Sequence, residues 1–328
     1  MAAEPLVQVH HLKKHFPQGR GMVKAVDDVS LNILPGETFG LVGESGCGKS
    51  TLGRTILGLY EATAGKVIFA GRELGVLSGG EMSRLRTQMQ IIFQDPASSL
   101  NPLMTTGVNI QEALAIHRVG SSSTQRAEVE RLLDEVGIGR QFQGTFPYEL
   151  SVGQQQRVAV ARALALKPKF IVCDEPVSSL DLSVQGQIIN LLLNLQKEYG
   201  LAYLFISHDL RVVQFLSHHI AVMYLGHIVE SGTTEEVYEH PLHPYTQALL
   251  SAVPEITAEG TQRRQRIVLS GEPPSPLNPP SGCPFHPRCE RRKENCSKAM
   301  PELLRISGEH EVACILYTPE SGGAESKE

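Results

Sequence analysis

The chain has 328 residues, 41% of them hydrophobic, and is long enough for about two globular domains with ordinary buried cores. Its formal net charge of −5, with basic and acidic residues interspersed, argues against a nucleic-acid-binding protein, which usually carries a basic domain or stripe. The N-terminus lacks the features of a signal peptide, and no apolar run approaches the roughly 20 residues of a membrane span. We therefore expect an intracellular chain that does not itself cross a bilayer.

The first predicted elements are strands followed by a phosphate-binding loop. Residues 23–33 alternate apolar and polar side chains, which predicts antiparallel strands near the N-terminus. Residues 37–42 form a short apolar strand, and residues 51–57 form a helix. Between them, residues 43–50 fit the pattern G-x-x-x-x-G-K-[ST], the P-loop. A glycine-rich turn that matches by chance is the alternative, and the strand and helix on either side argue against it.

A P-loop needs this order of elements for a physical reason. Its glycines let successive backbone N–H groups converge on a phosphate, and the helix N-terminus that follows adds partial positive charge. Lys49 is then placed to reach the β- and γ-phosphates, and the Ser50 hydroxyl is placed to bind Mg²⁺. The sequence therefore predicts a protein that handles nucleotides.

The middle of the chain predicts an α/β core. Residues 90–93, 170–173 and 202–206 are short apolar runs separated by helical patterns, as in a parallel sheet covered on both faces. Residues 95–167 contain no strand-like run, and residues 121–138 have amphipathic spacing, which predicts a helical subdomain inserted in the core.

An apolar strand over residues 169–173 ends in two acids, Asp174 and Glu175, which is the form of a Walker B element. Asp174 would hold Mg²⁺, and Glu175 would polarise the water that attacks the γ-phosphate, because phosphoryl transfer depends on positioning and charge stabilisation. Acids that merely face solvent at a strand end are the alternative.

Residues 149–157 distinguish among the classes of P-loop protein. Ser151 and Gln154 fit a capping box at a helix N-terminus, with an apolar helix face behind them. The same segment resembles the LSGGQ signature of the ABC ATPases, with Val152 where that pattern has its first glycine. This resemblance implies an ABC-type nucleotide-binding domain, with an antiparallel β-subdomain and a helical subdomain around a RecA-like core.

Other positions resemble the remaining landmarks of that family, in the same order. Gln94 resembles the Q-loop glutamine, residues 178–181 the D-loop, and His208 the switch histidine. Phe16 resembles the aromatic residue that stacks on adenine, although a core aromatic side chain is the alternative. The resemblance implies an ATP site formed by Phe16, Gly43, Glu44, Ser45, Gly46, Cys47, Gly48, Lys49, Ser50, Thr51, Gln94 and His208. It also implies catalytic roles for Glu175, His208 and Gln94, and Mg²⁺ bound by Ser50, Gln94 and Asp174.

In this family two nucleotide-binding domains hold ATP head to tail, so the resemblance implies that the chain pairs with a second ATPase. Ser151, Gly153 and Gln154 would then serve the partner's P-loop in trans. A valine at the first helical position is sterically permitted, so we expect the helix to form. Its side chain would crowd the phosphate in trans, and we hypothesise that the partner's site is the slower one.

The C-terminal region combines a proline-rich linker with four cysteines. Residues 245–253 predict a helix, and residues 270–282 contain five prolines that forbid regular structure. Cys283, Cys289, Cys296 and Cys314 supply the ligand count of a metal site. A disulfide is disfavoured in a reducing cytosol, and spacing alone leaves structural zinc, an iron–sulfur cluster or simply buried thiols. Residues 318–328 are polar, and we expect them to be disordered.

Residues 240–250, 271–276 and 282–289 resemble the C-terminal region of the ATPase subunits of bacterial dipeptide and oligopeptide importers. This resemblance implies an ABC ATPase domain at residues 1–235, with its helical subdomain at about 95–167, and a cysteine-rich extension at residues 236–328. It implies a [4Fe–4S] cluster on the four cysteines, with zinc as the alternative.

The same resemblance implies two membrane permeases, a related second ATPase and an extracytoplasmic binding protein as partners, at the cytoplasmic face of the cell membrane. We expect ATP-driven peptide import. The alternatives are a soluble ABC-type ATPase of translation or repair, and a redox-regulated ATPase that uses the cluster as its sensor.

Overall fold

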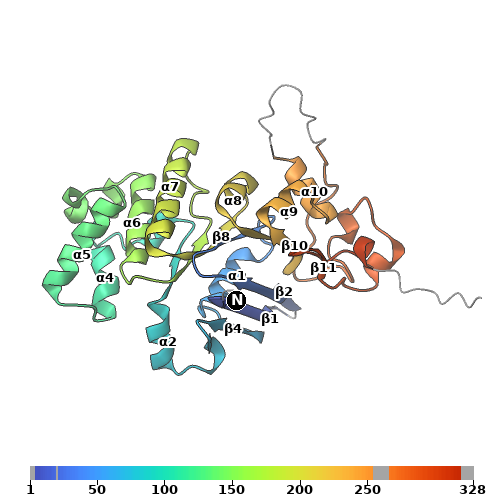
Figure 1. Cartoon of the computed structure of the whole chain (residues 1–328), viewed down its shortest axis with the longest axis horizontal. Coiled ribbons are helices and arrows are strands. Elements are labelled where there is room, and N and C mark those ends of the chain that lie inside the picture. The colour runs from blue at the N-terminus through green and yellow to red at the C-terminus, as the bar shows by residue number, and fades with distance from the viewer. Residues whose placement is uncertain (1–3, 20, 254–265, 319–328) are drawn as a thin grey trace, which may run out of the picture.

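Two β-sheets organise the computed structural model, which describes residues 4–19, 21–253 and 266–318 (Figure 1). The larger sheet has the strand order β11-β12-β10-β9-β3-β8-β7-β6. Neighbours from β9 through β3, β8 and β7 to β6 pair in parallel, whereas β10, β12 and β11 pair antiparallel. The strands are β3 Thr38–Val42, β6 Met89–Ile92, β7 Phe170–Asp174, β8 Ala202–Ser207, β9 His219–Tyr224, β10 His227–Thr233, β11 Leu304–Ser307 and β12 His310–Val312.

The centre of this sheet is covered on both faces. Every residue of β3, β7 and β8 is buried, so these strands are continuous apolar runs rather than alternating ones. The strands predicted at residues 37–42, 90–93, 170–173 and 202–206 are all confirmed to within one residue.

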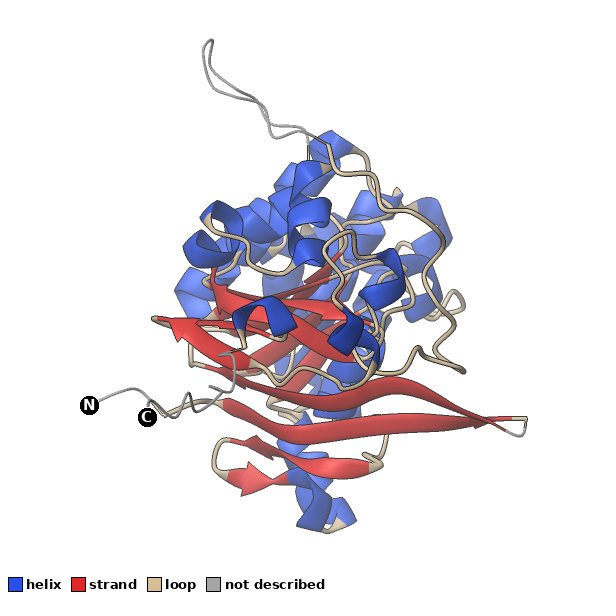
Figure 2. Cartoon of the chain, turned by 90° about the vertical axis from the view of Figure 1, so that its right-hand side faces the viewer, coloured by secondary structure: helices blue, strands red, loops and turns tan. Residues whose placement is uncertain are grey.

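The smaller sheet is antiparallel, with the order β2-β1-β4-β5. It comprises β1 Val7–Gln18, β2 Gly21–Ile33, β4 Ala64–Phe69 and β5 Arg72–Glu73. Burial alternates along much of β2, as its sequence pattern predicts. Figure 2 shows the long β1 and β2 strands below the larger sheet, with most helices on the opposite side.

The helices are α1 Lys49–Ile56, α2 Gly79–Arg86, α3 Pro96–Ser99, α4 Thr106–Ile116, α5 Ser122–Glu135, α6 Val152–Leu164, α7 Leu182–Tyr199, α8 Leu210–Leu216, α9 Thr234–Glu239 and α10 Pro244–Ser251. Helices α3 to α6 lie between β6 and β7 in the chain with no strand among them, as expected for the inserted helical segment. They form the green end of the molecule in Figure 1. No helix in the described ranges is long and apolar enough to cross a membrane.

The C-terminal residues are joined to the core by strand pairing. Strand β12 pairs with β10, at Glu230↔Val312 and Ser231↔Glu311, so β11 and β12 continue the larger sheet. Residues 270–282 contain no helix or strand, as their prolines predict. Short 3-10 turns at His286–Arg288, Glu294–Ser297 and Ile315–Tyr317 complete the region. The tail predicted to be disordered lies, from residue 319 onward, outside the described residues.

Candidate functional site

The P-loop leaves the buried strand β3 and enters helix α1, as its sequence predicts, except that the helix begins at Lys49 rather than Thr51. Gly43 and Gly48 have φ values of 153° and 110°. A Cβ atom would lie 2.2 Å from the Met223 carbonyl oxygen at Gly43 and 1.9 Å from the Ala25 carbonyl oxygen at Gly48. Both glycines are therefore required by backbone that crosses the loop at close range.

Lys49 and Ser50 connect this loop to strand β7. The buried Lys49 ammonium donates to the carbonyl oxygens of Gly43 (2.8 Å) and Glu44 (3.0 Å). The Ser50 hydroxyl donates to Asp174 Oδ1 (2.6 Å), and Arg54 Nη2 lies 3.3 Å from Asp174 Oδ2. A hydroxyl and a carboxylate in contact beside a helix N-terminus supply the hard oxygen ligands that Mg²⁺ prefers.

Glu175 is the centre of a polar cluster at the end of β7. Gln94 Nε2 donates to Glu175 Oε2 (3.1 Å), and His208 Nδ1 lies 3.1 Å from the same oxygen. Glu175 has a φ of 48°, a left-handed conformation that is unfavourable for a side chain with a Cβ, and its N–H donates to the Ile206 carbonyl (3.0 Å). The three residues predicted to be catalytic therefore meet around one carboxylate oxygen.

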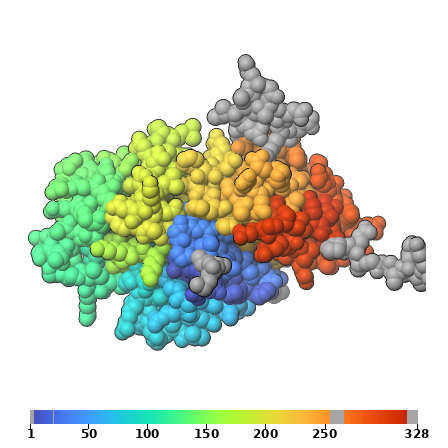
Figure 3. Space-filling model, in the orientation of Figure 1, coloured from blue at the N-terminus to red at the C-terminus, as the bar shows by residue number. Residues whose placement is uncertain are grey.

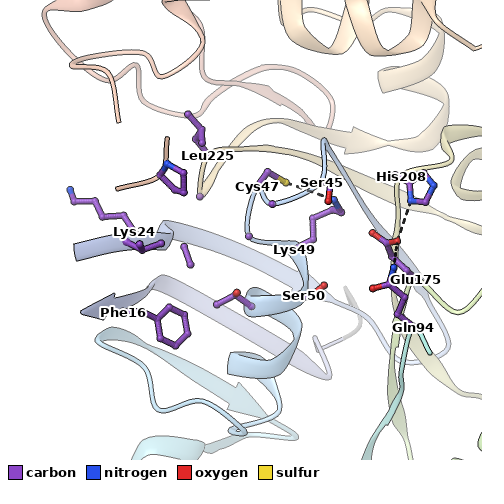
Figure 4. Close-up of a pocket in the computed structure, with 17 residues that line it drawn as sticks. Phe16, Lys24, Ser45, Cys47, Lys49, Ser50, Gln94, Glu175, His208 and Leu225 are labelled. Carbon is purple, nitrogen blue, oxygen red and sulfur yellow. Dashed lines mark hydrogen bonds and ion pairs between the residues drawn. The ribbon is translucent and has the colours of Figure 1, made fainter. Parts of the chain in front are cut away.

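A cavity of about 700 Å³ lies between the P-loop and this cluster. Figure 4 shows Phe16 at one end of the cavity, Glu175, Gln94 and His208 at the other, and Lys49 and Ser50 between them. The lining includes the following predicted ATP-site residues: Phe16, Ser45, Gly46, Cys47, Gly48, Lys49, Ser50, Thr51, Gln94 and His208. Gly43, Glu44 and Asp174 do not line it. Asp174 is buried behind Ser50.

Phe16 lines the cavity beside Tyr60 and Lys14. It packs edge-on against Tyr60, with ring centroids 5.4 Å apart, and Lys14 Nζ lies 4.7 Å from its centroid. Cys47 lies 5% exposed at the base of the loop, where burial raises the pKa of its thiol. That thiol therefore stays protonated, as a small apolar lining group.

Several residues that line the cavity were not predicted from the sequence. Leu225 and Gly226 form the tight turn between β9 and β10, with φ values of 42° and 84°, and the Gly226 N–H donates to the Cys47 carbonyl (2.9 Å). Gly226 alone hints at a turn here, whereas a leucine at the preceding position is not the Asn, Asp or Gly that a two-residue hairpin turn usually carries. Lys24 on β2 and Pro276 in the C-terminal region also line the cavity, and no local pattern indicates either.

The signature segment forms a helix N-terminus away from this cavity. The Gln154 N–H donates to Ser151 Oγ (3.3 Å) and the Ser151 N–H donates to Gln154 Oε1 (2.9 Å), so the predicted capping box is confirmed. Val152 is the first helical residue and its side chain is 47% exposed. A Cβ at Gly153 would lie 2.6 Å from Val184 Cγ1, so Gly153 lets α6 approach the start of α7.

The prediction of an iron–sulfur cluster, or of zinc, at Cys283, Cys289, Cys296 and Cys314 is wrong. Within the described part of the chain, no group of three or more His, Cys, Asp or Glu side chains is arranged to hold a metal ion. The cysteines are free thiols, and three of them are buried with an exposure below 10%. Burial raises the pKa of Cys283 to about 11 and also raises the pKa values of Cys289 and Cys314. Cys283 and Cys296 belong to the apolar core and Cys289 packs against it, so these cysteines act as small apolar side chains.

Two protein families match the chain. Residues 26–178 match the family described as ABC transporter, and residues 229–296 match the family described as oligopeptide/dipeptide transporter, C-terminal region.

The chain is similar over nearly its whole length to curated transport proteins. It is 47% identical to the oligopeptide transport ATP-binding protein AppF of Bacillus subtilis, covering 96% of this chain and 98% of the relative. It is 47% identical to the oligopeptide transport ATP-binding protein OppF of Salmonella typhimurium, covering 96% of this chain and 97% of the relative. Among solved structures, the dimeric ATP-binding cassette MJ0796 bound to ADP and Pi superposes with a TM-score of 0.64 at 31% identity, covering 70% of this chain and 98% of that one.

Proposed function

Because this chain belongs to the ATP-binding proteins of oligopeptide ABC transporters, we propose that it hydrolyses ATP to drive the import of di- and oligopeptides through a membrane complex. The observation that carries the proposal is the cavity of about 700 Å³ that brings the P-loop, Gln94, Glu175 and His208 together. A soluble ATPase of translation or repair is not favoured by these relatives.

The residues around the cavity fit a magnesium nucleotide. Gly43 and Gly48 leave no room for side chains, and the first N–H groups of α1 have no partners within the helix. We propose that ATP lies along residues 45–51, with its adenine against Phe16, and that Mg²⁺ is held by Ser50, Asp174 and Gln94. Bound Mg²⁺ would neutralise the charge on the phosphate oxygens.

The chain's own residues would then divide the work of hydrolysis. The Lys49 ammonium would exchange its two loop carbonyls for phosphate oxygens. The Glu175 carboxylate would orient the attacking water, while Gln94 and His208, both in contact with its Oε2 atom, fix the direction in which it points. The strained backbone of Glu175 supports this assignment, since such strain clusters at active sites.

We also propose that the chain works as one half of a pair of ATPases. Its signature residues Ser151, Gly153 and Gln154 do not line its own cavity, which supports a role toward a partner's phosphates. Two permeases and an extracytoplasmic peptide-binding protein would complete the assembly, with this chain at the cytoplasmic face of the membrane.

The substitution Glu175→Gln tests the proposal. In the complex copurified with its permeases, we expect peptide-stimulated ATP hydrolysis to fall by about 100-fold or more while nucleotide binding persists, because the substitution removes a base without removing a phosphate contact. Glu198→Gln, at an exposed position on α7, is the matched control. Hydrolysis that survives Glu175→Gln, or that does not respond to any peptide, contradicts the proposal.

A further inference from the structure

The second residue of the P-loop is held by the C-terminal region through both its backbone and its side chain. The Glu44 N–H donates to the hydroxyl of Tyr245 on α10 (2.9 Å). Its carboxylate accepts two hydrogen bonds from Arg288, at 2.8 Å from Nη1 and 3.1 Å from Nη2. A bidentate pair of this kind fixes orientation as well as distance, because both planar groups must align.

Arg288 is itself rigidly placed. It is 7% exposed, and its Nη1 atom also lies 3.4 Å from the hydroxyl of Tyr224 at the end of β9. Its neighbour Phe285 is 1% exposed and packs against Tyr224 and Tyr245, with ring centroids 5.3 Å from each. Tyr224 and Tyr245 also pack on each other, with centroids 4.7 Å apart. The guanidinium group therefore projects from a closely packed aromatic cluster and cannot easily follow a shift of the loop.

The other side of Glu44 faces the phosphate site. Its carbonyl oxygen accepts a hydrogen bond from the Lys49 ammonium (3.0 Å) and one from the Cys47 N–H (3.3 Å). A movement of the Glu44 peptide group would therefore displace the turn of the P-loop. It would also displace Lys49, which is predicted to bind phosphate. Glu44 occupies a variable position of the P-loop pattern, so the pattern itself does not require this carboxylate.

Residues 272–276 lie beside the same loop, across a cavity from it. They line a cavity of about 340 Å³ together with Glu44, Ser45, Gly46 and Cys47, and Pro276 also lines the nucleotide cavity. Figure 3 shows the red C-terminal residues packed directly against the core. The C-terminal region thus contacts one end of the P-loop through α10 and through Arg288, and residues 272–276 enclose a cavity beside it.

We propose that Arg288 is a positioning residue for ATP binding, which acts through Glu44 to hold the P-loop in its phosphate-binding geometry. The inference rests on the proposed function, and it adds that nucleotide affinity depends on how the C-terminal region is docked. Arg288 need not touch the nucleotide. Because such coupling is reciprocal, bound nucleotide should also tighten the docking of residues 283–297.

The first test measures the affinity of the intact chain for Mg²⁺ with AMP-PNP, a non-hydrolysable ATP analogue, by calorimetry. Arg288→Met keeps the length of the side chain and removes its charge, so we expect the Kd to rise by about tenfold, within the usual range of site-to-site coupling. Arg288→Lys keeps the charge but loses the bidentate geometry and should give an intermediate Kd. Arg305→Met is the matched control, because Arg305 forms an exposed ion pair with Glu311 (3.2 Å) in the same region.

A double-mutant cycle with Glu44→Gln separates positioning from general destabilisation. If Arg288 acts through Glu44, the double variant should bind AMP-PNP no more weakly than the worse single variant. Additive losses would contradict this route. If Arg288→Met does not fold, Arg288→Lys and Glu44→Gln still provide the affinity test.

Hydrogen exchange distinguishes a positioning role from a purely structural one, because only the positioning role makes exchange in the C-terminal region depend on bound AMP-PNP. We expect AMP-PNP to slow exchange of residues 283–297 in the unmodified chain and to have little effect on them in Arg288→Met. An unchanged Kd in folded Arg288→Met, or an equal loss in Arg305→Met, would overturn the positioning role while leaving the proposed function intact. Failure of the unmodified chain to bind AMP-PNP would overturn both.

Discussion

The nucleotide core and the C-terminal region are held in place by different interactions. The central strands β3, β7 and β8 are buried at every position, so apolar burial dominates there. The C-terminal residues also bury apolar side chains such as Phe285 against the core, but they add buried or bridging polar pairs, namely Glu230 with His310, His219 with Glu37 and Glu309, and Glu44 with Arg288. The core therefore tolerates changes in charge and pH that should loosen the C-terminal region, and the following predictions test that difference.

The largest expected effect is loss of activity without loss of the fold. Lys49→Ala removes the ammonium placed at the P-loop, and we expect the ATP hydrolysis rate to fall by about 100-fold or more, as for other lost transition-state contacts. Urea unfolding should show a loss of at most about 1–3 kcal/mol, because the Gly43 and Glu44 carbonyls lose a donor while the apolar sheet is untouched. Lys66→Ala, at an exposed position on β4, is the control. A large loss of stability would contradict the separation of site and core.

The next effect is a local loss of stability in the C-terminal region. Glu230 is fully buried and accepts hydrogen bonds from the N–H groups of Leu242 (2.7 Å) and His243 (2.8 Å), and its carboxylate contacts His310 Nε2 (2.7 Å). Glu230→Ala leaves all three groups without this partner, so we expect a loss of about 3 kcal/mol. Hydrogen exchange should accelerate in α10 and β12 but not in β7 or β8. Equal acceleration in both regions would show that they unfold as one unit.

A smaller effect should appear with pH. Hydrogen bonds to Glu37 and then Glu309 raise the pKa of His219 to about 9, above its ordinary value of 6.5. The ion pairs of His219 therefore contribute fully to the free energy of unfolding below pH 6.5, and this contribution is lost as the pH rises through 9. Burial lowers the pKa of His243 to about 3, so that residue affects stability only below pH 6.5. Thermal unfolding should show stability falling between pH 6.5 and 9, and His219→Gln should remove this slope. If stability still falls with pH in His219→Gln, another group is responsible for the pH dependence.

The smallest expected effect concerns the signature. Val152 is exposed at the first helical position, so Val152→Gly should leave stability nearly unchanged. If the side chain crowds a phosphate in trans, the ATPase rate at the partner's site should rise by about two- to fivefold in the assembled complex. This is less than the tenfold change in rate that a barrier lowered by about 1.36 kcal/mol would give. Unchanged rates and nucleotide affinities at both sites would show that the valine is neutral.

These differences also explain what could be predicted from the sequence. The P-loop, the β7 acids and the capping box at Ser151 depend on neighbours within a few residues, so spacing alone located them. Local patterns did not reveal contacts such as Pro276 at the cavity or Arg288 on Glu44, which join residues more than two hundred positions apart. The metal-site prediction failed for another reason. The number of cysteines and a family resemblance do not show whether buried sulfur atoms are arranged to bind a metal.

The pairing of β12 with β10 also bears on how the chain behaves as it folds. Without β12, strand β10 would present unpaired N–H and C=O groups along one side of a mostly apolar sheet, a template for adding strands from other molecules. With β12 and β11 in place, that edge ends in a short strand carrying Arg305, with exposed positions throughout its second half. Strands β11 and β12 therefore protect an edge that could otherwise pair with other molecules, and a chain synthesised only as far as β10 would expose that edge.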